Sequence, residues 1–248
     1  MIPPQKTIYT ILLLILLTSC QNHYKTFYKQ FAIYNWQNIE FYIGEAATVK
    51  STDMAGDVAN YRRRGYGVIG FSDFSSEMVK HPEVKMKKLA KEIGAEIIVW
   101  NQVYAGTVTG QYYLHTPYYK GWQSYRIDRY NYGSVFLSKL KDIGAGVFVR
   151  DLTADEKAQK HLDAGAYIAV IMDDGPALKA KLAEGDVIVK AGNKIIEEAR
   201  SFETIDLENL NFLRIGYVRG GRKKRVTLDL KSNNILPKRS GSKLISED

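Results

Sequence analysis

The stretch that most constrains the fold of this chain is residues 175–192, which read GPALKAKLAEGDVIVKAG. An apolar run over residues 168–172 precedes it and predicts a buried strand. Pro176 then fits the first position of a short helix, because its fixed φ is helical and its missing N–H has no partner there. Residues 184–186 end this helix, and residues 187–189 predict a second buried strand.

This spacing of Pro-Ala, a later Ala and Leu, and then Gly-Asp-x-Ile resembles the core of bacterial PDZ domains. Two positions depart from the family pattern, since Lys181 stands where such domains usually have Gly and Ala191 where they often have Asn. The resemblance implies a PDZ-like, partly open β-barrel capped by helices, over about residues 144–230. An unrelated β-α-β unit is the alternative interpretation.

The rest of this second domain shows the expected alternation of helix and strand. Ser201 is a suitable N-cap for a helix over residues 201–210. Residues 211–219 alternate as a strand, and Gly220 and Gly221 predict a two-residue hairpin turn before a returning strand. We therefore expect the PDZ-like domain over residues 141–231, followed by a disordered tail over residues 232–248.

The N-terminus has the pattern of an exported protein. Lys6 precedes an apolar run, residues 8–17, that is short for a membrane-spanning helix and typical of a signal peptide, here residues 1–19. The run ends in Leu-Thr-Ser-Cys, which resembles the bacterial lipobox and implies that Cys20, the chain's single cysteine, carries acyl chains such as palmitate. Gln21 after it favours the outer membrane. An ordinary signal peptide with an accidental cysteine is the alternative.

The net charge of +8 is compatible with nucleic acid, with an anionic membrane surface, or with no specific partner. Export makes nucleic acid an unsuitable partner, so we expect none. The basic clusters at residues 62–64 and 222–225 are then solvated faces, with a contact to anionic lipid headgroups as the alternative.

The first half of the chain predicts a small α/β sandwich domain, so the fold class of the whole is α+β. Residues 20–43 read as a tether, and residues 44–140 as the domain. Helices are expected over residues 57–64 and 83–93, with Gly94 ending the second, and strands over residues 66–71 and 96–100, with a polar loop over residues 72–82 between them.

Residues 105–132 form a Tyr-rich insertion, and residues 132–140 are expected to close the domain as an edge strand or a returning strand. Aromatic side chains that pair across a β-hairpin explain the insertion, and a surface that binds a partner or the cell wall is the alternative. In that case the protein would act in surface adhesion.

The sequence lacks the residue patterns of the common hydrolases. Neither Gly-x-Ser-Gly-Gly nor His-Glu-x-x-His occurs, and the four histidines are scattered, so we expect no catalytic residue, no metal and no cofactor. One loop at a strand end, Phe71, Ser72 and Asp73, is a candidate small-ligand site. No nucleophile–base pair stands beside it in the sequence, which favours the alternative that this loop caps a helix. The alternative function is then an enzyme or ligand binder in the first domain, with the PDZ-like domain recruiting substrate.

The PDZ resemblance implies a peptide site that works by β-augmentation, in which an extended segment joins a sheet edge. The glycine-bearing loop would hold a terminal carboxylate with its N–H groups, and the strand after it would pair with the peptide. The alternative is that the two glycines merely join the domains. We therefore predict a non-catalytic envelope lipoprotein that binds peptide segments or protein C-termini. The expected site residues are Gly144, Ala145 and Gly146 in the loop, Val147, Phe148 and Val149 in the strand, and Ile205 and Leu210 on the helix.

Overall fold

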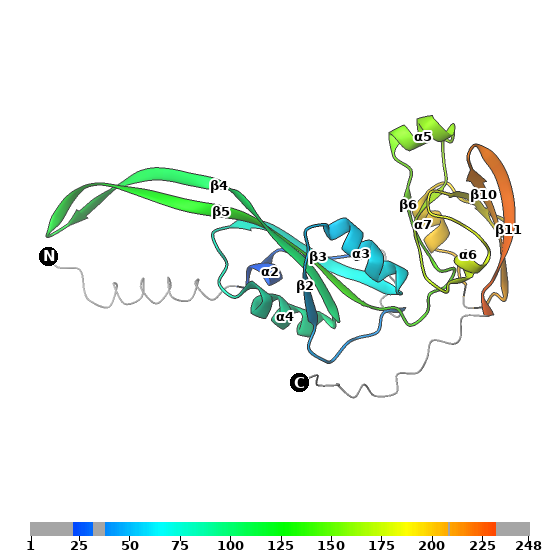
Figure 1. Cartoon of the computed structure of the whole chain (residues 1–248), viewed down its shortest axis with the longest axis horizontal. Coiled ribbons are helices and arrows are strands. Elements are labelled where there is room, and N and C mark those ends of the chain that lie inside the picture. Colours follow the sequence, from blue (N-terminus) through cyan, green and yellow to red (C-terminus); the bar gives the residue numbers. More distant parts are fainter. Residues whose placement is uncertain (1–21, 32–37, 208, 232–248) are drawn as a thin grey trace. The chain divides into compact units, whose positions relative to one another are not determined.

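The computed structural model describes residues 22–31, 38–207 and 209–231. It divides into two compact units, the first containing residues up to 58 together with 66–139, and the second containing residues 59–65 together with those from 140 onward (Figure 1). The expected signal peptide, the lipidation site Cys20 and the C-terminal tail lie outside the described residues.

The first unit is built on a five-stranded sheet with the order β1-β3-β5-β4-β2. β2 runs parallel to β4, and the other neighbours are antiparallel. β5 is therefore the central strand. Of the two predictions for residues 132–140, the returning strand is confirmed and the edge strand is wrong, because β3 and β4 pair with the two sides of β5. The strands are β1 Tyr28–Gln30, β2 Ala47–Lys50, β3 Tyr66–Ser76, β4 Ile97–Thr116 and β5 Tyr119–Lys139.

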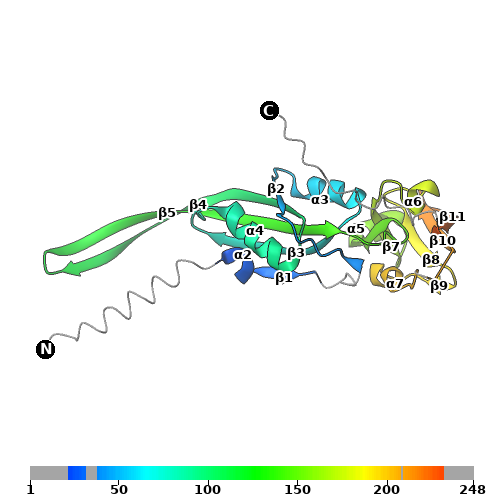
Figure 2. The same cartoon turned by 90° about the horizontal axis from the view of Figure 1, so that it is seen from below.

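The helices of this unit are α2 His23–Thr26, α3 Met54–Arg63 and α4 Pro82–Ile93. α2 and α4 lie side by side on one face of the sheet (Figure 2). α4 ends at Gly94 in the left-handed conformation, as predicted, because glycine adopts a φ of 73° without strain. Residues 22–31, expected in the tether, instead supply α2 and β1, and Tyr24 is fully buried against the ring of Phe74.

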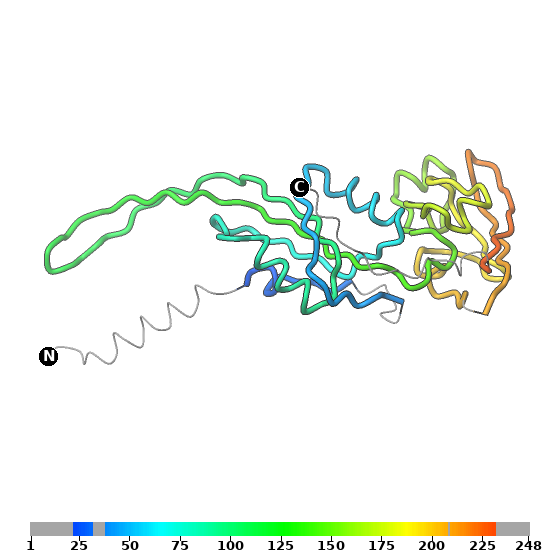
Figure 3. The backbone as a smooth tube through the Cα atoms, turned by 60° about the horizontal axis from the view of Figure 1, so that its bottom comes forward, coloured from blue at the N-terminus to red at the C-terminus, as the bar shows by residue number. Residues whose placement is uncertain are grey.

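β4 and β5 continue far beyond the sheet as a two-stranded ribbon, which Figure 3 shows in green. Within the described part of the chain, residues 106–129, here called the arm, pair only with each other. The predicted cross-strand aromatic pairs are confirmed: the rings of Tyr113 and Trp122 are 5.5 Å apart, and those of Tyr104 and Tyr130, just before the arm, are 5.7 Å apart.

The second unit contains a six-stranded sheet with the order β11-β10-β8-β7-β6, to which β9 adds by pairing with β8. The neighbours are antiparallel. Three short helices accompany the sheet. The strands are β6 Val147–Asp151, β7 Ala166–Ile171, β8 Val187–Ala191, β9 Lys194–Ile195, β10 Phe212–Arg219 and β11 Arg222–Asp229, and the helices are α5 Ala154–Lys160, α6 Pro176–Lys179 and α7 Ala199–Glu203.

The Gly-Asp pair of the opening motif has a clear structural role. Gly185 has a φ of 91°, and the carboxylate of Asp186, which is 1 % exposed, accepts hydrogen bonds from the Ala183 N–H at 2.9 Å and from Arg219 Nε and Nη2 at 2.6 Å each. The Asp186 carboxylate therefore connects the turn that follows α6 to Arg219 at the end of β10. Lys181, at the family's usual glycine position, has a φ of 62°, the left-handed region that glycine tolerates best.

The predicted hairpin after β10 is confirmed, with φ values of 56° at Gly220 and 73° at Gly221. The predicted helix over residues 201–210 is wrong: α7 begins at Ala199 and ends at Glu203. Its first turn is capped from a distant strand, because Asp151 Oδ1 accepts the Ala199 N–H at 2.7 Å, so Ser201 is not the N-cap.

Candidate functional site

Strand β6 lies at the end of the second sheet and contains the predicted residues Val147, Phe148 and Val149. It pairs with β7 on one side, and no strand among the described residues pairs with the other. The register shifts between Phe148 and Val149, which is a bulge that bends the strand. An edge strand with one unoccupied side has the geometry that a guest strand needs.

The loop before β6 requires both of its glycines. Gly144 and Gly146 have φ values of 51° and 73°. A Cβ on Gly146 would lie 2.9 Å from the Cα of Gly175, so a larger residue does not fit without backbone movement. The carbonyls of Ala145 and Gly146 accept the N–H groups of Ala177 at 3.1 Å and Met172 at 2.9 Å. The 175–192 stretch therefore holds this loop in place.

Two N–H groups of the loop already have partners inside it. Gly144 N–H donates to Asp142 Oδ1 at 2.9 Å, and Gly146 N–H donates to the carbonyl of Ile143 at 2.7 Å. This differs from the expected loop, whose N–H groups would be open to the terminal carboxylate of a peptide. The side-chain carboxylate of Asp142 therefore accepts one of the loop's N–H groups, and a carbonyl of the loop accepts another.

The chain from the start of α7 to Leu207 runs alongside β6 in the opposite direction. Ala199 is bonded to Asp151 at the end of β6, while a methyl of Leu207 lies 3.3 Å from the position of a Cβ on Gly144, at its start. Ile205 and Leu207 both pack against the core of this unit, and of these two only Leu207 lines the cavity described next. The role of Ile205 in closing a peptide pocket stays a prediction.

A cavity of about 160 Å³ lies at the loop end of β6. The predicted residues Gly144 and Leu210 line it, and Leu210 is 38 % exposed. Asp142 and Lys231 also line the cavity. The sequence did not predict either residue as part of the site, because nothing in its local sequence marks it. The full lining is Asp142, Gly144, Leu207, Leu210, Asn211, Leu230 and Lys231.

The other end of β6 carries charge. Desolvation raises the pKa of Glu203 on α7, and the nearby carboxylate of Asp151 acts in the same direction. The guanidinium of Arg62, which belongs to residues 59–65 of the second unit, lies 5.0 Å from the centre of the Phe148 ring and lowers that pKa. Phe148 is accordingly only 8 % exposed, so its side chain packs inside this unit.

The candidate ligand loop of the first unit is not a loop. Phe71, Ser72 and Asp73 lie inside β3, which continues to Ser76, and they pair with β5. Ser72 is buried, and its hydroxyl donates to the Tyr24 carbonyl at 2.6 Å. Ser72 and Asp73 therefore do not mark the end of the strand, because both pair with residues of β5. Their side chains do not converge on a ligand site.

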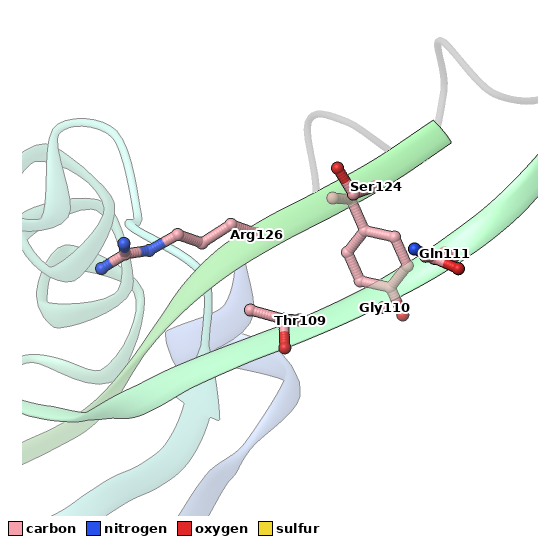
Figure 4. Close-up of a pocket in the computed structure, with 6 residues that line it drawn as sticks. Thr109, Gly110, Gln111, Ser124 and Arg126 are labelled. Carbon is pink, nitrogen blue, oxygen red and sulfur yellow. The ribbon is translucent and has the colours of Figure 1, made fainter. Parts of the chain in front are cut away.

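The arm carries a shallow hollow of about 370 Å³ on its two strands. Figure 4 shows Thr109, Gly110 and Gln111 on one strand, with Ser124 and Arg126 on the other. The hydroxyl of Tyr125 lies 2.5 Å from where a Cβ of Gly110 would be, so this glycine leaves room for a tyrosine from the opposite strand. The hollow is open, and its lining consists of the polar residues Thr109, Gln111, Ser124 and Arg126 together with Gly110 and Tyr125.

Among the described residues, no helix is long and apolar enough to cross a membrane. No three histidine, cysteine, aspartate or glutamate side chains in the same part of the chain gather as ligands for a metal ion.

Comparison with known proteins finds a local sequence similarity. The chain is 37 % identical over 87 residues to a probable periplasmic serine endoprotease DegP-like of Pseudomonas putida (strain W619). The match covers 34 % of this chain and only 18 % of that protein. No family model matches the chain.

Among solved structures, the chain is similar to the HtrA3 PDZ domain bound to a phage-derived ligand (FGRWV), at 12 % identity and a TM-score of 0.31, over 50 % of this chain and 88 % of that one. It is also similar to the HtrA-type protease AlgW with a decapeptide, at 22 % identity and a TM-score of 0.32, over 39 % of this chain and 37 % of that one. TM-scores of 0.31 and 0.32 do not establish a shared fold.

Proposed function

We propose that the second unit is a PDZ-like domain that binds an extended peptide along β6. One observation carries the proposal: among the described residues, β6 pairs with a strand on one side only, and it lies between a loop held by the 175–192 stretch and the segment from α7 to Leu207. Backbone pairing would supply the affinity, and the cavity beside Leu207 and Leu210 would receive a side chain. The local similarity to a DegP-like protein supports this interpretation.

A peptide array probed with the whole chain tests the proposal, followed by amide hydrogen exchange on the best peptide. Binding by β-augmentation slows exchange within β6 Val147–Asp151, because guest carbonyls then accept from its outer N–H groups. Protection confined to other strands, or no bound peptide at all, would refute the proposal.

A matched pair of variants locates the binding pocket. Leu210→Ser removes an apolar wall of the cavity and is expected to weaken binding about tenfold, on the scale of one lost hydrophobic contact. Leu178→Ser is the control, because Leu178 on α6 is 48 % exposed and does not line the cavity. Equal loss in both variants would place the peptide elsewhere.

We further propose that the protein is a non-catalytic lipoprotein of the cell envelope, anchored through Cys20 and favouring the outer membrane. The signal-like N-terminus and the lipobox-like Leu-Thr-Ser-Cys support this assignment. Metabolic labelling with a radioactive or alkyne-bearing palmitate should mark the chain, and Cys20→Ser should abolish the label. Unchanged labelling of the Cys20→Ser variant would refute the proposed lipid anchor at Cys20.

The arm supports a second candidate function, adhesion to the cell wall or another surface. Its side chains include large exposed aromatics, with Tyr118 98 % and Trp122 66 % exposed. Replacing residues 109–126 by Asn-Gly joins Val108 to Ile127, which are cross-strand partners, through a short turn. If the arm binds the wall, cosedimentation with purified cell-wall polymer is lost while the unfolding midpoint is unchanged. Full cosedimentation of the shortened protein would exclude this role.

A further inference from the structure

The second sheet has a side that does not face the hydrophobic core, and β8, β9, β10 and β11 contribute to it. β8 pairs with β9 and with β10, and β10 also pairs with β11 (Figure 1). Alternate residues of β10 over Leu213–Tyr217 belong to the core. Successive side chains of a strand point to opposite faces, so Phe212, Arg214 and Gly216 lie on the outer side.

The register of the strands brings cationic residues together on this outer side. Gly216 is the Cα partner of Lys190 on β8 and of Arg225 on β11. A Cβ on Gly216 would lie 3.2 Å from the Cβ of Lys190, which shows that the two positions share a face. Neighbouring strands are about 4.8 Å apart, so the Cα atoms of Lys190 and Arg225 lie about 10 Å apart across Gly216. Arg214 stands two residues before Gly216 on the same face of β10.

These three cations are not neutralised by the protein. Lys190, Arg214 and Arg225 are exposed, and among the described residues none of their side chains has a hydrogen-bond or ion-pair partner. Asp229, the carboxylate on the same side of β11, lies at the end of the strand opposite Phe212. Like charges at neighbouring positions of a sheet repel one another, and an external anion would relieve this repulsion.

Two large apolar side chains stand beside the cations. Ile195 on β9 is the Cα partner of Lys190 and is 71 % exposed, and Phe212, two residues before Arg214, is 62 % exposed. A free anion in water makes no use of them, whereas a lipid bilayer presents phosphate groups directly above acyl chains. These residues are here called the basic face: Lys190, Ile195, Phe212, Arg214, Gly216 and Arg225.

We propose that the basic face binds the surface of an anionic lipid bilayer. Lipid phosphates would lie between Lys190, Arg214 and Arg225, and the side chains of Ile195 and Phe212 would enter the boundary between headgroups and acyl chains. The inference rests on the membrane attachment proposed above, because an acyl chain on Cys20 keeps the whole chain at such a surface.

The test places the environment-sensitive fluorophore NBD on the basic face of the whole acylated chain. Ile195→Cys provides the attachment point, since acylation of Cys20, the chain's one cysteine, leaves no other thiol to label. Ala158→Cys carries the control reporter, because Ala158 is exposed on α5 and does not belong to the four strands.

The expected signal depends on the charge of the lipid. On vesicles of phosphatidylglycerol and phosphatidylcholine, the emission at position 195 should rise and shift to shorter wavelength, while the emission at position 158 should stay the same. The response should be absent on vesicles of phosphatidylcholine alone. It should also disappear at about 1 M salt, where the Debye length falls to about 3 Å.

Two charge variants, made in the chain labelled at position 195, assign the response to the basic face. Lys190→Gln with Arg225→Gln should lower the ratio of bound to free reporter about 30-fold, at about fivefold for each basic side chain near an anionic surface. Lys157→Gln with Arg200→Gln is the matched control, because it removes one lysine and one arginine from exposed positions on α5 and α7 of the same unit. This control should keep most of the response.

Several results would overturn the inference. They are an unchanged reporter at position 195 on anionic vesicles, an equal response on neutral vesicles, and a response that survives Lys190→Gln with Arg225→Gln. If soluble polyglutamate without vesicles gives the full response, the basic face takes an acidic protein and the bilayer is the wrong partner. If mass spectrometry finds no acyl group on Cys20, the proposed anchor fails, and the same reporters in the Cys20→Ser chain test the basic face independently.

Discussion

Replacing Arg219 by methionine tests the explanation of the Gly-Asp motif. The side chain of Asp186 is 2 % exposed, and Arg219, which holds it through two 2.6 Å hydrogen bonds, is 37 % exposed. Removing one partner of a buried ion pair costs about 3–5 kcal/mol, because a charge is left buried and unpaired. Water can reach the vacated half-exposed position, and the Ala183 N–H still donates to Asp186, so we expect a loss of about 2–3 kcal/mol.

Arg150→Met is the matched control for this prediction. Arg150 also holds a carboxylate, that of Glu156, through two 2.6 Å hydrogen bonds, but their side chains are 41 % and 20 % exposed. Solvent screens that pair, and its loss should cost about 1 kcal/mol or less. The two variants therefore share chemistry and bond geometry and differ in the burial of the carboxylate.

The assay is urea unfolding of the whole chain followed by circular dichroism, with amide exchange of β8 reporting on the second unit. Tryptophan fluorescence does not report on residues 140–231, which contain no tryptophan. Asp186→Asn combined with Arg219→Met should recover part of the lost stability, because the unpaired charge is then absent. If Arg219→Met lowers the free energy of unfolding by no more than Arg150→Met does, the burial of Asp186 is not what makes the Arg219–Asp186 pair important.

Three other changes have predictable effects on stability. Lys181→Gly should raise the free energy of unfolding by about 1 kcal/mol, measured in urea, because φ is 62° at this position and glycine removes the left-handed strain; a destabilised variant would contradict this. Gly146→Ala should lower it by about 2 kcal/mol or more, since a Cβ there adds strain at a φ of 73° and a 2.9 Å approach to Gly175; wild-type stability would show that the loop can shift. The hydrogen bonds from Arg150 lower the pKa of Glu156 from 4.5 to about 2, so its contribution is complete above about pH 4.5 and is lost as the pH falls toward 2; Glu156→Gln should lack this dependence in acid titrations of stability.

Short-range patterns predicted the parts of the fold that depend on local chemistry. The amphipathic pattern and Gly94 predicted α4, Pro176 marked the start of α6, and Gly220 with Gly221 marked a hairpin turn. In each case one or two residues limit the backbone conformation almost regardless of their surroundings. Larger features required partners from elsewhere in the chain: β3 runs past Phe71 because β5 pairs with it as far as Ser76.

The candidate site likewise contains features that the sequence predicted and features that only the structure shows. Gly144, Gly146 and the strand after them were recognisable from the sequence, because a glycine pattern and an apolar run are local signals. The length of α7, the place of Leu207 in the wall, and the approach of Asp142 and Lys231 to one cavity were not, since they depend on contacts between residues far apart in the chain. Local residues thus specify where the edge strand begins, while long-range packing sets the charge and shape of the cavity beside it.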